Sequence, residues 1–87
     1  MLIKYTPAAK DDLDFWITTG NKTIIKKIVQ LLNAIKENPF IGIGKPEPLK
    51  YELSGKWSRR ITKEHRLVYS LQENILFIYS LRGHYKL

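Results

Sequence analysis

Two different periods of apolar residues divide this chain. Between Thr6 and Glu37 apolar residues recur every three or four positions, whereas beyond Pro48 they tend to alternate with polar residues. The first spacing is typical of a helix with one buried face, and alternation is typical of a half-buried strand. A short apolar segment at Leu2–Tyr5 precedes both and predicts a first strand.

Two helices are expected in the first half of the chain. The first begins at Thr6-Pro7, because Thr is a good N-cap and Pro fits the first helical position, and it ends at Gly20-Asn21. The second runs from Lys22 to Glu37 and ends at Asn38-Pro39. Its apolar face comprises Ile24, Ile25, Ile28, Leu31, Leu32 and Ile35. The break between the helices is so short that they must form an antiparallel hairpin.

Four strands are expected in the second half, after a loop over residues 38–48. They are Leu49–Leu53, Trp57–Thr62, His65–Leu71 and Ile75–Leu81. The short gaps between them require antiparallel pairing. The fold class is therefore α+β: an N-terminal strand, an antiparallel helix hairpin and an antiparallel β-meander packed on the helices. The first strand must join this sheet, at a position that the sequence leaves open.

The turn between the two middle strands decides which side chains share a face of the sheet. If Lys63-Glu64 forms this turn, Ile61 lies directly opposite Arg66. One face then carries Trp57, Arg59, Ile61, Arg66 and Val68, and the other carries Arg60, Thr62, His65 and Leu67. In this register the charged side chain of Arg66 faces either solvent or a cleft.

Length and composition predict a single domain over residues 1–87. The absence of cysteine excludes disulfides, thiolate catalysis and Cys-ligated zinc, and two histidines without clustered acidic residues argue against another metal site. We therefore expect no metal and no cofactor. Neither an export signal nor a membrane-spanning apolar segment is evident, so the expected location is cytoplasmic, without membrane association.

Positive charge is concentrated in the second half of the chain. The net charge is +7, and nine of the fifteen Lys and Arg residues, against four of the eight acidic residues, lie from Lys45 onward. Such a surface is typical of binding to a polyanion, most often nucleic acid; a solubilising surface or an acidic protein partner are the alternatives. The basic residues Lys50, Lys56, Arg59, Arg60 and Lys63 are interleaved with Tyr51 and Trp57, which suits single-stranded RNA. Trp57 is alternatively a core residue.

Glu47 and Arg66 are candidate catalytic residues because of the residues that flank them in the sequence. Glu47 lies between Pro46 and Pro48, which stiffen its backbone, as the position of a general base requires. Arg66 is charged within an apolar strand, and its permanent charge and five donors suit a phosphate that gains charge in a transition state. The alternatives are a surface Glu in a loop, and an ion pair of Arg66 with Glu64 or Glu52.

Histidine supplies the third candidate. His84, followed by Tyr85, comes after the last predicted strand. The pKa of an unperturbed His is about 6.5, so His84 can donate a proton near neutral pH. Alternatively, a lone His close to a chain end is inert. His65 lies in an apolar strand and is interpreted as structural.

Taken together, these segments resemble the YoeB (Txe) toxins of the RelE superfamily. The resemblance rests on the ordered set KPEPLK (45–50), LSG (53–55), WSRRIT (57–62), EHRLVY (64–69) and the terminal His84-Tyr85, and it extends to Asp11-Asp12, Trp16 and KKI (26–28). Two features depart from the family pattern. Arg82-Gly83 stands where a bulkier residue often precedes the His-Tyr pair, and Lys86-Leu87 extends the chain beyond it.

The resemblance implies the toxin of a type II toxin–antitoxin system. Such toxins are metal-independent, ribosome-dependent mRNA endonucleases that cleave mRNA in the ribosomal A site and inhibit translation. The partners implied are mRNA on the ribosome, a YefM-like antitoxin and a second copy in a homodimer. By the same resemblance, Glu47 matches the general base, Arg66 the group that stabilises the transition-state phosphate, and His84 the general acid. Lys50, Arg60 and Tyr85 match supporting positions that bind phosphate or position the substrate.

Two other functions compete with this interpretation. One is a non-catalytic module that binds RNA or the ribosome through the same basic surface. The other is a ParE-type relative that poisons gyrase. The presence of Glu47, Arg66 and His84 in one chain favours the endoribonuclease over both.

Overall fold

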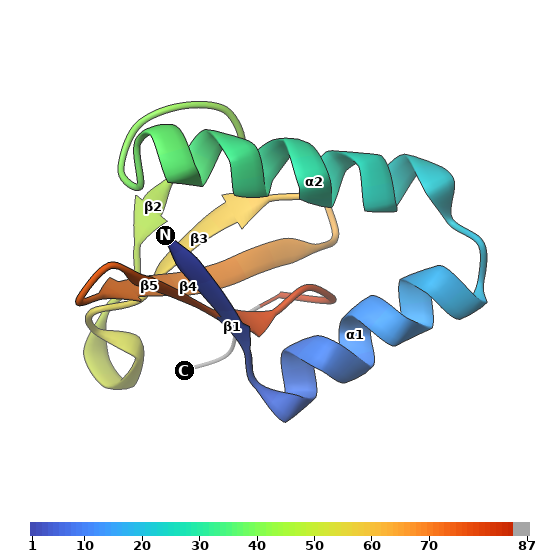
Figure 1. Cartoon of the computed structure of the whole chain (residues 1–87), viewed down its shortest axis with the longest axis horizontal. Helices are drawn as coiled ribbons and strands as arrows, with labels where there is room; N and C mark the ends of the chain where they lie inside the picture. Colours follow the sequence, from blue (N-terminus) through green and yellow to red (C-terminus); the bar gives the residue numbers. More distant parts are fainter. Residues whose placement is uncertain (85–87) are drawn as a thin grey trace.

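The computed structural model describes residues 1–84 and has the predicted α+β fold (Figure 1). Its elements, in order, are β1 (Leu2–Tyr5), α1 (Pro7–Thr18), α2 (Lys22–Glu37), β2 (Glu47–Pro48), a 3₁₀ helix (Tyr51–Leu53), β3 (Trp57–Arg60), β4 (Arg66–Gln72) and β5 (Ile75–Ser80). The strands form one sheet in the order β1-β5-β4-β3-β2. β3, β4 and β5 pair antiparallel, as predicted; β2, in a segment predicted to be a loop, also pairs antiparallel with β3, and β1 completes the sheet by pairing parallel with β5.

Local capping sets both helix starts where the sequence predicts them. The side chain of Thr6 accepts a hydrogen bond from the N–H of Ala9 at 3.1 Å, and Pro7 occupies the first turn of α1. Asn21 Oδ1 accepts one from the N–H of Ile24 at 3.2 Å at the start of α2. These bonds satisfy donors that the first helical turn leaves without partners. The short turn between the helices sends the chain back across the molecule (Figure 1).

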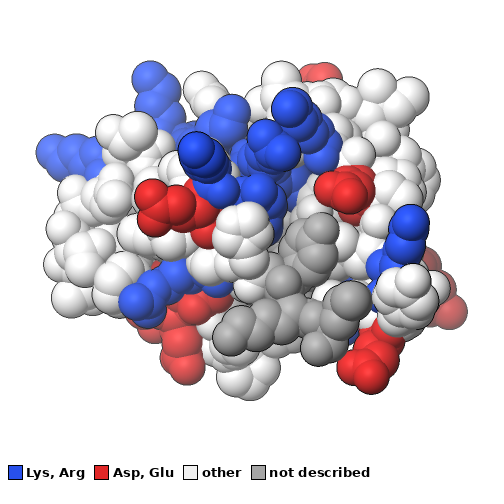
Figure 2. Space-filling view, turned by 180° about the vertical axis from the view of Figure 1, so that it is seen from behind, with Lys and Arg blue, Asp and Glu red and all other residues white. Residues whose placement is uncertain are grey.

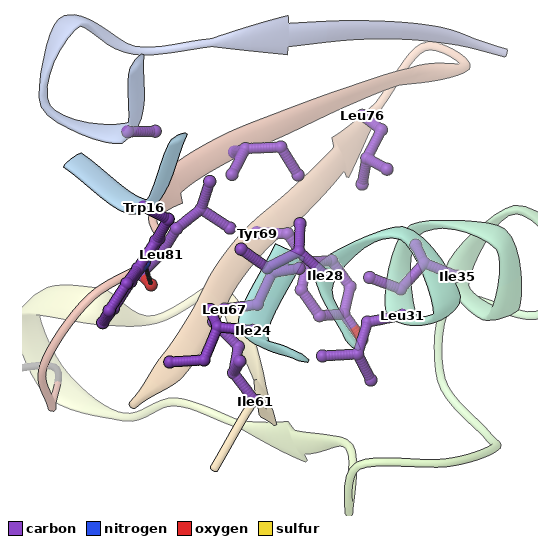
Figure 3. Packing of buried hydrophobic residues seen from close by; sticks show 12 residues of the cluster. Trp16, Ile24, Ile28, Leu31, Ile35, Ile61, Leu67, Tyr69, Leu76 and Leu81 are labelled. Atoms are coloured by element: carbon purple, nitrogen blue, oxygen red, sulfur yellow. Dashed lines mark hydrogen bonds between the residues drawn. The ribbon is translucent and has the colours of Figure 1, made fainter. Parts of the chain in front are cut away.

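The core lies between the helices and one face of the sheet. In Figure 3 side chains of α2, such as Ile28 and Leu31, point toward Leu67 and Tyr69 of β4. The whole buried cluster comprises Ala9, Trp16, Ile24, Ile28, Leu31, Ile35, Ile61, Leu67, Tyr69, Leu76, Ile78 and Leu81. Since alternate residues of a strand point to opposite faces, the neighbours of Leu67 and Tyr69 along β4 face away from the helices.

The predicted register of β3 and β4 is wrong by one position. Arg60 pairs with Arg66, and Arg59 pairs with Leu67, so Arg59 faces the helices and Arg66 does not share its face. The turn between these strands is longer than Lys63-Glu64. Thr62 Oγ1 accepts hydrogen bonds from the N–H groups of Glu64 and His65, and the carbonyl of His65 accepts from Ile61. These side-chain bonds stabilise a turn over 61–65 and shift the pairing.

The predicted strand at Leu49–Leu53 is also wrong. Pairing with β3 is limited to Glu47 and Pro48, and the chain then turns through the 3₁₀ helix Tyr51–Leu53. Tyr51 has a φ of 57°, in the left-handed region, which no strand accommodates. Across residues 1–84, neither helix has the length and apolar character needed to cross a membrane.

Candidate active site

The sheet brings Glu47, Arg60 and Arg66 onto the face that points away from the helices. Glu47 pairs with Ser58, two residues before Arg60, and Arg60 pairs with Arg66. Directly paired residues project from the same face, and so do residues two apart on one strand. Strands lie about 4.8 Å apart and rise about 3.4 Å per residue, which places the Cα atoms of Glu47 and Arg66 about 12 Å apart. Long side chains can reach one phosphodiester group from these positions.

A buried arginine holds the loop that leads to Glu47. Arg59 is 0 % exposed, and its guanidinium donates to three loop carbonyls: Nη2 to Asn38 at 2.7 Å and to Ile41 at 3.1 Å, and Nη1 to Ile43 at 3.1 Å. Nε donates to the hydroxyl of Tyr69 at 3.1 Å. Carbonyl oxygens thus compensate the buried charge, so the loop and Arg59 hold each other in place.

Tyr69 extends this network to the start of the loop. Its hydroxyl donates to the carbonyl of Pro39 at 2.6 Å while it accepts from Arg59. Burial raises the pKa of Tyr69, and the hydrogen bond and charge of Arg59 partly oppose that rise. The phenol therefore stays protonated, as its role as a donor requires.

Gly44 brings the loop against β3 just before Glu47. Its carbonyl accepts from the N–H of Arg60 at 2.7 Å. Its φ is 83°, and a Cβ there would lie 2.7 Å from Cδ2 of Leu31 and 3.1 Å from Cβ of Arg59. Only glycine fits this position without displacing its neighbours. The approach precedes the pairing of Glu47 and Pro48 with β3, and the side chain of Glu47 is exposed.

The guanidinium of Arg66 is held by the turn that precedes it. Nη1 donates to the carbonyls of Thr62 at 2.9 Å and Lys63 at 3.0 Å, and the residue is half-buried. These acceptors are backbone carbonyls, which orient the side chain but carry no net charge that would neutralise the guanidinium. This environment suits a group that binds an anion.

The last described residues bring His84 to the start of β4. The N–H of Arg66 donates to the carbonyl of Gly83 at 3.0 Å, and the N–H of Gly83 donates to Nδ1 of His65 at 2.8 Å. His84 follows directly and is exposed. The backbone of His84 therefore lies next to the start of β4, on the side of Arg66 opposite Arg60. Tyr85, and the Lys86-Leu87 extension, lie outside the described residues.

The other predicted binding residues divide into surface and structural groups. Lys50 and Arg60 are exposed, and Figure 2 shows Lys and Arg side chains gathered on the face seen from behind, with acidic groups on either side. Arg59 is wrongly included in the RNA-binding set, because it is fully buried. Trp57 packs against the core and against Phe40, with ring centroids 4.9 Å apart, which agrees with the alternative of a core role.

Within residues 1–84 no three His, Asp or Glu side chains are grouped to hold a metal ion. The charged candidate residues that share one face of the sheet are instead the carboxylate Glu47 and the guanidinium groups of Arg60 and Arg66. A carboxylate can accept a proton, an imidazole can donate one, and guanidinium groups can stabilise a phosphate. The arrangement can therefore support proton transfer at a phosphodiester.

Comparison with known proteins identifies similar sequences over almost the whole chain. The family described as "YoeB-like toxin of bacterial type II toxin-antitoxin system" matches residues 5–85. The protein named Toxin YoeB from Synechocystis sp. is 49% identical over 86 residues, which is 99% of each chain. Toxin YoeB from Escherichia coli strain K12 is 48% identical over 85 residues, 98% of this chain and 100% of that protein.

Solved structures share the fold as well as the sequence. A YoeB/ParE toxin from Agrobacterium tumefaciens has a TM-score of 0.94 at 42% identity, covering 98% of this chain and 100% of that one. A YoeB dimer from Staphylococcus aureus has a TM-score of 0.89 at 43% identity and covers 98% of both chains. A YoeB-YefM complex from the same organism has a TM-score of 0.88 at 45% identity, covering 98% of this chain and 99% of that one.

Proposed function

Because the chain belongs to the family of YoeB-like toxins of bacterial type II toxin–antitoxin systems, we propose that it is a ribosome-dependent mRNA endoribonuclease. It cleaves mRNA in the ribosomal A site and thereby inhibits translation. The observation that carries the proposal is the arrangement of Glu47, Arg66 and His84. Two observations support it: the sheet pairing puts Glu47 and Arg66 on the same face, and the backbone of Gly83, directly before His84, is hydrogen-bonded to Arg66.

The reaction needs one base, one acid and one cation. Glu47 removes the proton of a ribose 2′-hydroxyl, and the 2′-oxygen bonds to the adjacent phosphorus. The bond from phosphorus to the 5′-oxygen breaks, and His84 protonates that leaving oxygen. The products are a 2′,3′-cyclic phosphate and a 5′-hydroxyl. Arg66 stabilises the charge that develops on the phosphoryl oxygens.

Each of these roles has a typical contribution to the rate. General base and general acid catalysis supply roughly 10²–10⁴-fold each.

Arg60, opposite Arg66 in the sheet, and the exposed Lys50 bind neighbouring phosphates, and Tyr85 positions the substrate. The requirement for a 2′-hydroxyl explains selectivity for RNA over DNA. No step of this mechanism is assigned to a metal ion.

The proposed protein partners follow from the structural relatives. One relative is a YoeB dimer and another is a complex of YoeB with YefM, both at more than 40% identity to this chain. We expect this chain to form a homodimer and to be inhibited by a YefM-like antitoxin. The basic surface favours an antitoxin with an acidic binding segment.

The test is primer extension on a defined mRNA, with and without programmed ribosomes. We expect cleavage at the A-site codon only with ribosomes, lost by about 10²–10⁴-fold in Glu47→Ala and in His84→Ala. Ribosome binding, measured by cosedimentation, should stay near that of the wild type in both variants. Glu37→Ala is the control, because Glu37 is an exposed acid at the end of α2.

The same experiment separates the two competing functions. Ribosome binding without cleavage would replace the endoribonuclease by a binding module. Inhibition of gyrase supercoiling without mRNA cleavage would indicate the ParE-type activity, a name that one structural relative carries alongside YoeB. Equal loss of binding and cleavage in Glu47→Ala or His84→Ala would show that the assigned roles are wrong.

A further inference from the structure

The segment Leu81–Gly83, which leads to His84, is held by side chains from two distant parts of the chain. Asp12 of α1 accepts a hydrogen bond from the N–H of Leu81 through Oδ2 at 2.9 Å. Trp16 donates from Nε1 to the carbonyl of the same residue at 3.0 Å, and the two residues lie side by side in Figure 3. Both backbone groups of Leu81 are therefore bound by α1.

His65 holds the next part of this segment. Its Nδ1 accepts the N–H of Gly83 at 2.8 Å, so this nitrogen carries no proton in that bond. The ring of His65 meets the ring of Trp16 edge to face, with centroids 4.8 Å apart. Between Leu81 and Gly83, the guanidinium of Arg82 lies over the ring of Phe15, 3.6 Å from its centroid. The segment is thus fixed at three consecutive residues.

We propose that Asp12, Trp16 and His65 are positioning residues that hold His84 beside Arg66, an inference that rests on the proposed endoribonuclease function. These three residues form a tail clamp. A segment outside the helices and strands is well ordered only where other groups hold it. A general acid must be held within hydrogen-bond reach of the leaving oxygen, and misplacement by about 1 Å can cost about 10²-fold in rate. The tail clamp supplies that order, although its members do not touch the substrate.

The chemistry of His65 allows its hydrogen bond to be separated from its packing. His65→Phe keeps an aromatic ring against Trp16 but removes the acceptor for the N–H of Gly83. His65→Asn removes the ring but keeps an acceptor oxygen close to the position of Nδ1. Positioning through the hydrogen bond therefore predicts that Asn is the milder change. Packing alone predicts the reverse order.

The first measurement does not depend on activity. Trypsin cleaves after Arg82 when the surrounding segment opens, and mass spectrometry detects the released peptide as residues 83–87 or, after a further cut at Lys86, as residues 83–86. We expect release to be about tenfold faster in His65→Phe than in the wild type, because one partly buried hydrogen bond is lost, and near the wild-type rate in His65→Asn. Ile28→Val, a core change of comparable cost on α2, is the control for general destabilisation.

The second measurement is single-turnover cleavage on programmed ribosomes. His65→Phe should lower the cleavage rate constant about tenfold with unchanged ribosome affinity, and His65→Asn should recover most of the loss. In a His84→Ala background, His65→Phe should cause no further loss, because the tail clamp acts through His84. The full tenfold loss in that background, or a near-normal rate in His65→Phe beside a damaged His65→Asn, would overturn the proposal.

The two measurements also separate this inference from the function on which it rests. If the wild type does not cleave mRNA, the proposed function fails and the catalytic role of the tail clamp fails with it. The trypsin result then still decides whether His65 holds the tail. If the wild type cleaves and release after Arg82 is unaffected in His65→Phe, the tail clamp is refuted while the endoribonuclease stands.

Discussion

Replacing Arg59 tests how the loop before Glu47 is held. Arg59→Leu removes a guanidinium that is 0 % exposed and that makes four hydrogen bonds, three to loop carbonyls and one to Tyr69. Each acceptor left without a donor costs about 1 kcal/mol at the lower end of the usual range, since the loop can move to reach water. The four acceptors together cost about 4 kcal/mol, and burial of the apolar Leu side chain offsets about 1 kcal/mol of this loss. The expected loss is therefore about 3 kcal/mol.

Two further variants define the specificity of this effect. Arg59→Lys keeps the charge, but one ammonium cannot span three carbonyls and a phenol, so the expected loss is about 2 kcal/mol. Arg60→Leu is the matched control: Arg60 is the next residue, carries the same side chain and is exposed on the other face. Its effect on the free energy of unfolding should stay within about 0.5 kcal/mol.

Urea unfolding followed by tryptophan fluorescence measures these differences, because the domain contains Trp16 and Trp57. A loss of about 3 kcal/mol is a large part of the roughly 5–10 kcal/mol typical of a small domain, so Arg59→Leu should be measurable but fragile. Equal effects of Arg59→Leu and Arg60→Leu would refute the reasoning. They would mean that the buried hydrogen bonds of Arg59 contribute no net stability.

Three further predictions follow from individual contacts. Gly44→Ala should destabilise the fold by about 2–3 kcal/mol, since the added Cβ would clash with Leu31. Gly55→Ala, whose Cβ would meet nothing within 4 Å, should cost about 1 kcal/mol because of the positive φ alone. Urea unfolding of both variants measures the difference. Tyr69 has a raised pKa in the folded state, so its stabilising contribution is complete below the unfolded pKa of about 10 and is lost as pH rises through the folded value. The free energy of unfolding, measured from pH 9 to 11, should therefore fall less steeply in Tyr69→Phe than in the wild type. Equal slopes in the two proteins would contradict the assignment of this fall to Tyr69. Arg60→Leu should weaken RNA binding and reduce the magnitude of the slope of log affinity against log salt concentration by about 0.7, the value for one phosphate contact on a single strand. An unchanged slope would show that Arg60 does not bind phosphate.

The fold class and the helices could be predicted because their signals are local. The caps Thr6 and Asn21 lie within three residues of the N–H groups that they satisfy, and the period of α2 is visible within its own sixteen residues. The strands were harder to predict. A run containing Leu49, Tyr51 and Leu53 has the alternation of a strand, but the left-handed backbone of Tyr51 ends the pairing after Pro48. Backbone conformation there depends on the turn, which composition does not reveal.

The candidate site was only partly predictable for the same reason. Prolines single out Glu47, and charge in an apolar strand singles out Arg66, so both were identified without a structure. The adjacent arginines 59 and 60 could not be assigned to faces, because one residue of register exchanges the two. The structure decides that Arg59 is buried beneath the loop and that Arg60 shares with Arg66 the face that points away from the helices. Thr62, whose side chain stabilises the longer turn, was the available signal.

What the sequence determined by itself is the kind of element at each place and the residues with chemical potential. These follow from periodicity, capping and side-chain type, which act over a few neighbouring residues. Only the tertiary structure decided which of those residues meet. The bonds of Asp12 and Trp16 to Leu81 join positions 69 and 65 residues apart, and the parallel pairing of β1 with β5 joins the two ends of the fold. Contacts at such separations depend on the packing of the whole chain, and no local pattern encodes them.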